Sequence, residues 1–156
     1  MTEDARFADG GDRPLRLMAR DADDLQVVSA LLQDAIFPAS EMRWTRADRR
    51  FAILLNRFRW EDGGGGSRHA YERVQAVMVI EDVQRVRSQG VEKGDPDTIL
   101  SLLSIAFEPG EDGTGEVVLT LAGDGIISVG VEALEVIVKD VTRPYVAPSR
   151  KAPQHD

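Results

Sequence analysis

The sequence contains no cysteine and only two histidines, and these two shortages exclude several kinds of site. Without cysteine there is no thiol catalysis, no disulfide and no cysteine-based zinc or iron–sulfur centre. His69 follows a glycine-rich segment and His155 lies near the end of the chain, so no HxH or HExxH spacing indicates a metal site. We therefore expect no metal and no cofactor.

Long apolar runs are also missing. The longest, Val74–Ile80, is interrupted by Gln75, whereas a membrane-spanning helix needs about 20 apolar residues. The first residues, MTEDARFADGGDR, are acidic and polar and lack the basic start and apolar middle of a signal peptide. We expect no membrane insertion and a cytoplasmic location, which agrees with the lack of cysteine.

Motifs for nucleophilic or phosphate chemistry are absent as well. Neither Ser67 nor Ser101 lies in a GxSxG motif, and no histidine can be placed beside either of them. The Gly-Asp-Gly at 123–125 and the glycines at 63–66 are not followed by the helix that a phosphate loop requires. An enzyme is therefore not the favoured interpretation.

What the chain does have is a series of short apolar segments separated by Gly, Pro and Asp. With 156 residues it fits one domain, in which roughly 130 residues can form a single core. We expect residues 1–13 to be a flexible lead-in, 14–145 to be a single β-rich domain, and 146–156 to be a flexible tail. The lead-in is too polar to offset the entropy of ordering it, and the tail region contains Pro144, Pro148 and Pro153.

The first elements of the domain are predicted from periodicity. LRLMARD alternates as a short strand, and Asp21 then stands where a helix cap would, followed by apolar residues at helical spacing. This pattern predicts a helix over 22–34 that stops before Pro38. From Met42 to Glu61 the chain is typical of a hairpin that turns at Ala47-Asp48, and the DGGGGS at 62–67 is expected to be an exposed loop.

The rest of the domain is predicted to be mostly strands. Alternating apolar residues indicate strands over 71–80, 83–86, 99–107, 117–121 and 126–131, with a bend at Glu81-Asp82. The segment 132–141 fits both a helix and a strand. Early glutamates and a late Lys139 match the helix dipole, so we expect a short C-terminal helix there. The fold class is therefore α+β, mainly β: a barrel or a curled antiparallel sheet with an early and a C-terminal helix.

The charges are segregated along the chain. Net charge is −8, yet between Arg43 and Arg87 ten arginines face six acidic residues. The overall negative charge makes nucleic acid an unlikely partner, while arginine beside tryptophan suits an anionic ligand or a protein partner. The residues expected to bind such a partner are Arg43, Trp44, Arg46, Arg57, Arg59 and Trp60. The structural alternative is that these arginines cover strand edges and pair with nearby carboxylates.

These observations favour a non-enzymatic binding or scaffold module. One alternative is a small enzyme or small-molecule binder with an acid/base pocket that uses Glu81, Asp82, Arg85 or His69, because a carboxylate in an apolar strand junction would have a raised pKa. A second alternative is a homodimer joined along a strand edge.

Four segments together resemble a family of small alphaproteobacterial proteins known as a domain of unknown function. They are LRLMARDADDLQVVSALLQDAIF, RRFAILLNRFRWE, YERVQAVMVIEDVQRVRSQGV and LSLLSIAFEPG, and the likeness covers about 15–145. The resemblance implies no activity and assigns no catalytic residue. The order of strands, the IEDVQRV bend and a terminal helix also look like a pleckstrin-homology-like barrel, which implies two orthogonal sheets closed by the last helix.

Overall fold

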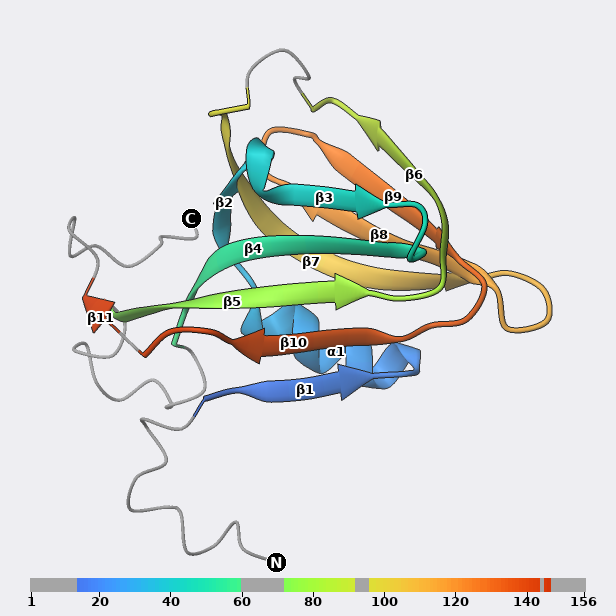
Figure 1. The fold of residues 1–156 in the computed structure, drawn as a ribbon, viewed down its shortest axis with the longest axis horizontal. Helices are drawn as coiled ribbons and strands as arrows, with labels where there is room; N and C mark the ends of the chain where they lie inside the picture. The colour runs from blue at the N-terminus through green and yellow to red at the C-terminus, as the bar shows by residue number, and fades with distance from the viewer. Residues whose placement is uncertain (1–13, 60–71, 92–95, 144, 147–156) are drawn as a thin grey trace, which may run out of the picture.

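The computed structural model describes residues 14–59, 72–91, 96–143 and 145–146. One α-helix, one short 3-10 helix (η2) and a series of strands make up this part of the chain (Figure 1). In chain order they are β1 Arg16–Ala19, α1 Ala22–Leu31, β2 Ile36–Pro38, η2 Ala39–Glu41, β3 Met42–Thr45, β4 Arg50–Phe58, β5 Glu72–Ile80, β6 Val83–Gln89, β7 Ile99–Pro109, β8 Gly115–Leu121, β9 Ile126–Val131, β10 Val136–Asp140 and β11 Tyr145–Val146.

The strands form one antiparallel sheet that curls into two facing layers. Its order is β1-β10-β5-β4-β2-β7-β8-β9-β6, with β3 added to β4 and β11 added to β5. In Figure 1 the layer of β4, β5, β10 and β1 crosses the front, and β7, β8 and β9 lie behind it. Short β2 joins the layers, because Ile36 pairs with Asn56 of β4 and with Ser101 of β7.

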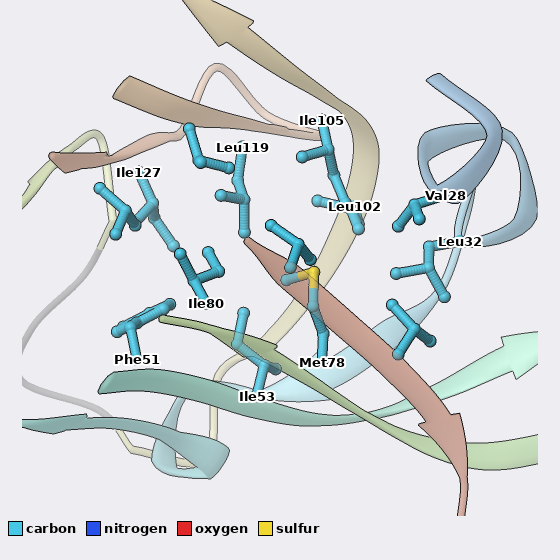
Figure 2. Close-up of a cluster of buried hydrophobic side chains, with 14 of the residues drawn as sticks. Val28, Leu32, Phe51, Ile53, Met78, Ile80, Leu102, Ile105, Leu119 and Ile127 are labelled. Carbon is cyan, nitrogen blue, oxygen red and sulfur yellow. The ribbon is translucent and has the colours of Figure 1, made fainter. Parts of the chain in front are cut away.

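Alternation along the strands fills the space between the layers with apolar side chains. Figure 2 shows Ile53 and Met78 from one layer facing Leu102 and Leu119 from the other. Each of these four side chains is fully buried. Because successive residues of a strand point to opposite faces, the period-2 pattern of the sequence produces this core directly.

Helix α1 closes one side of the curled sheet. Asp21 caps it, since its carboxylate accepts a hydrogen bond from the Asp24 N–H at 2.7 Å. The helix contacts β1 and β7 and buries Leu25 and Val28 between them. The Ile105 N–H donates to the Ser29 hydroxyl at 2.9 Å, so the helix also satisfies part of the edge of β7.

Most of the predicted elements are confirmed. The hairpin is β3 with β4, the bend at Glu81-Asp82 links β5 to β6, and the helix begins at Ala22, though it ends at Leu31 rather than Asp34. The predicted lead-in and glycine-rich loop lie outside the described residues, and so does the predicted tail except for Val146, which pairs with Glu72 of β5 as part of β11.

The predicted C-terminal helix over 132–141 is wrong, because this segment contains strand β10. Val136, Ile137 and Val138 are β-branched, and the strand lies between β1 and β5, where it pairs on both edges. Tertiary pairing therefore outweighs the charge pattern that favoured a helix. The likeness to a pleckstrin-homology-like barrel depended on a closing helix at 132–141, and the structure has strand β10 there instead.

Candidate binding groove between β3 and β6

Among the described residues, no strand joins the two layers on the side opposite α1. There β3 pairs only with β4 and β6 pairs only with β9 among the described residues, so each strand has a free edge facing the other. In Figure 1, β6 curves past the end of β3 on this side of the molecule. The free edges border a hollow of about 310 Å³, which we call the seam groove.

The seam groove is mainly apolar. The inward side chains of the strands supply its walls and floor, and η2 and the segment after β6 supply its far end. Its lining consists of Met42, Trp44, Phe51, Val86, Ser88, Ile127, Ala39, Ser40, Val91 and Pro96. Trp44 pairs with Phe51 across β3 and β4, which places two aromatic rings at the groove.

A second hollow of about 580 Å³ adjoins the first and is basic. We call it the basic recess; it is lined by Trp44, Arg46, Arg49, Val83, Gln84, Arg85 and Val86. Trp44 and Val86 line both hollows, so an apolar pocket and a cationic one meet at these two side chains. No carboxylate lines either hollow within the described part of the chain.

Backbone hydrogen bonds fix both ends of this site. At one end the Val83 N–H donates to the Arg49 carbonyl at 2.9 Å, which ties the start of β6 to the turn after β3. At the other end the Ser40 N–H donates to the Pro96 carbonyl at 2.9 Å. The site is therefore bounded at one end by the turn after β3 bonded to β6, and at the other by η2 bonded to the segment before β7.

Arg49 and Arg46, two cations of the recess, have different surroundings. Arg49 is hydrogen bonded to Glu132, and this bond together with the charge of Glu132 raises the pKa of Arg49 above its ordinary value, so it stays cationic at every physiological pH. The Arg46 guanidinium lies 5.9 Å from the centroid of the Trp44 ring. No ion pair joins Arg43 or Arg46 to any residue that the structure describes.

The structure divides the residues expected to bind an anion into two groups. Trp44 and Arg46 both line the basic recess, and Arg43 lies beside Trp44 on the outer face of β3, where it is exposed. Trp60 lies outside the described residues.

Arg57 and Arg59 are buried instead. Arg57 is paired with Asp140 at 2.9 Å, and Arg59 is paired with Glu72. Neither arginine lines the seam groove or the basic recess.

The acid/base alternative named Glu81, Asp82, Arg85 and His69. Both carboxylate oxygens of Glu81 accept hydrogen bonds from Arg50 Nε at 3.1 Å, and neither Glu81 nor Asp82 lines the recess that contains Arg85. Arg85 itself donates to Glu116 at 3.0 Å. His69 lies outside the described residues. Of the described residues of this alternative, only Arg85 lines the recess.

The sequence patterns did not identify β6 as part of the site. The signal was present in VQRVRSQ, where Val83 and Val86 are apolar and Arg85 and Arg87 are basic. A strand with one basic face is typical of a sheet edge. What the pattern could not show is that this edge faces β3, because the two strands are brought together by the curl of the whole sheet.

Comparison with known proteins gives a family but no activity. Residues 15–155 match the model of a family described as a protein of unknown function, DUF2948. No curated protein and no solved structure matches the chain. Within the described residues, no helix has the length and apolar character required to cross a bilayer.

Proposed function

The chain belongs to the DUF2948 family of proteins of unknown function, and from its own residues we propose that it is a cytoplasmic, non-enzymatic binding module. Its site is the seam groove with the basic recess, and its partner carries a negative charge next to an apolar group. The observation that carries this proposal is the position of Trp44, whose ring lines the apolar groove and the basic recess at once.

Charge and shape support an anionic partner rather than a neutral one. Arg46 and Arg49 stand on the recess side of Trp44, and the groove on its other side is lined by Met42 and Phe51. A ligand pocket of a few hundred cubic ångströms with apolar walls and a small number of polar groups is the usual form of a binding site. The whole chain carries a net charge of −8, so the attraction of an anion has to be local to this surface.

The experiment uses 8-anilinonaphthalene-1-sulfonate as a probe, because this molecule joins an aromatic system to a permanent negative charge. We expect the folded protein to bind one equivalent, with a rise in probe fluorescence. Arg46→Glu should weaken binding about tenfold, which corresponds to about 1.4 kcal/mol, and Trp44→Ala should weaken it at least as much. Raising the salt concentration should weaken binding further, since exposed charges are screened.

Arg16→Glu is the matched control. Arg16 is an exposed arginine on β1, at the end of the strand order opposite β6, and the change alters net charge by the same amount. Far-ultraviolet circular dichroism and a thermal melt establish that each variant is folded. Equal probe affinity in Arg46→Glu, Trp44→Ala and Arg16→Glu would show that the probe binds elsewhere and would refute the proposal.

A further inference from the structure

We propose that the partner is an extended acidic peptide, which adds as a strand along the free edge of β6 and fills the seam groove. This inference rests on the proposed function and specifies its partner. Among the described residues β6 pairs only with β9, and β3 pairs only with β4. An unpaired strand edge presents a row of N–H and C=O groups that another extended chain can pair with.

The inner face of the slot selects apolar side chains. Val86 and Ser88 of β6 face the groove on one side, and Met42 and Trp44 of β3 face it on the other, with Ile127 among the residues beneath. In an added strand every second side chain would point into this space. Those positions of the peptide should therefore be aliphatic or aromatic.

The outer face of the slot selects acidic side chains. Arg43 of β3 and Arg85 and Arg87 of β6 are exposed on the outer face of the sheet. Arg85 and Arg87 share the single carboxylate of Glu116, at 3.0 and 2.7 Å, and Arg43 is in no ion pair with another described residue. The remaining side chains of the peptide would stand in this row of cations, so carboxylates are expected there.

The ends of the slot limit the length of the peptide segment. The Val83 to Arg49 and Ser40 to Pro96 hydrogen bonds lie at its two ends, and β6 itself is 7 residues long. The recognised segment should therefore contain no more residues than β6, with apolar and acidic side chains in alternation. Arg46, in the recess beyond Trp44, would contact an acidic residue at one end of the segment.

The experiment selects twelve-residue peptides from a random display library on the immobilised full chain. We expect the selected peptides to share the alternation of apolar and acidic residues and to bind with one-to-one stoichiometry in fluorescence polarisation. Arg46→Glu should weaken the affinity for these peptides at least tenfold, and Arg16→Glu should leave that affinity unchanged. Ser88→Phe should block them, because its ring would occupy the groove from an exposed strand position.

Backbone N-methylation of the selected peptide tests strand addition without changing the protein. Methyl groups on alternate residues leave every side chain in place but remove the N–H groups along one edge. We expect one of the two methylation patterns, on odd or on even residues, to weaken binding at least tenfold. We also expect the unmethylated peptide to slow amide hydrogen exchange in β6. A peptide that binds equally in both methylated forms would overturn the inference.

The outcomes separate this inference from the proposed function. If the sulfonate probe binds at Trp44 but no acidic peptide is selected, the binding module stands and the peptide partner is refuted. If neither binds, both are refuted. If light scattering shows a dimer that Arg46→Glu dissociates, the groove is occupied by a second copy of the chain, and the peptide inference is again overturned.

Discussion

Arg57 and Asp140 form a buried bidentate ion pair that joins β4 to β10 across β5. Arg57 Nε lies 2.9 Å from Asp140 Oδ1 and Arg57 Nη2 lies 2.9 Å from Asp140 Oδ2. The side chains are only 1% and 3% exposed. Asp140 Oδ2 also accepts a hydrogen bond from the Leu15 N–H at 2.7 Å, so the same carboxylate holds the start of β1.

Removing one member of this pair should be costly. Asp140→Asn removes the carboxylate that makes this bidentate pair with the buried Arg57 cation, and we expect the free energy of unfolding to fall by about 3 kcal/mol. The double variant Arg57→Met with Asp140→Leu should recover much of that loss, because it removes both buried charges. Urea denaturation of the three proteins measures the difference, and a loss below about 1 kcal/mol in Asp140→Asn would contradict the role given to the pair.

Two neighbouring leucines of β7 should respond very differently to truncation. Leu102 is 0% exposed and points into the core of Figure 2, whereas Leu103 is 39% exposed on the opposite face. Leu102→Ala should lower the free energy of unfolding by about 3 kcal/mol, through lost burial and the cavity left behind. Leu103→Ala, the control, should cost less than about 1 kcal/mol. Similar losses in both variants would mean that the strand faces are assigned incorrectly.

The cap of α1 gives a smaller and more local prediction. Asp21→Ala removes the acceptor for the Asp24 N–H, and the expected loss is about 1 kcal/mol. Asp21→Asn keeps an oxygen at the same position and should lose only part of this amount. Thermal unfolding of the two variants measures this difference in stability. Equal melting temperatures for Asp21→Ala and Asp21→Asn would count against the cap.

Asp82 holds a left-handed backbone conformation at the bend between β5 and β6, with φ of 56°. Glycine adopts this conformation without steric cost. A residue that has a β-carbon and makes no local hydrogen bond adopts it only at a steric cost. We expect Asp82→Ala to be about 1 kcal/mol less stable than Asp82→Gly. Chemical denaturation provides the comparison, and an alanine variant as stable as the glycine variant would disagree with the strain argument.

Local patterns were sufficient to predict the parts of the fold that depend on neighbouring residues. The β3 to β4 hairpin, the cap at Asp21 and the bend at Glu81-Asp82 are all specified within a few positions of the sequence. Strand β10 was not predictable in this way. Its residues fit a helix or a strand. The strand is stabilised by pairing with β1 and β5, which lie far away in the sequence and occupy both of its edges.

Local sequence patterns predicted the candidate site only in part, for the same reason. Trp44 and Arg46 are recognisable in the sequence as a cationic and aromatic pair, and in the structure both line the basic recess. Arg57 and Arg59 had the same local appearance, but their partners Asp140 and Glu72 are supplied by other strands. Burial of a charge depends on such a distant partner, so composition alone could not separate the two groups of arginines.

The pairing of β1 with β10 also governs when the fold can be completed. Leu15 and Asp140, which are hydrogen bonded to each other, are separated by 125 positions along the chain. Because synthesis proceeds from the N-terminus, β1 and α1 are made before β10, the strand that pairs with β1. Contacts between such distant segments form slowly, because a long loop must close first. The edge of β1 that pairs with β10 therefore stays unpaired until the intervening elements have been made, and an unpaired strand edge exposes the nascent chain to aggregation during this interval.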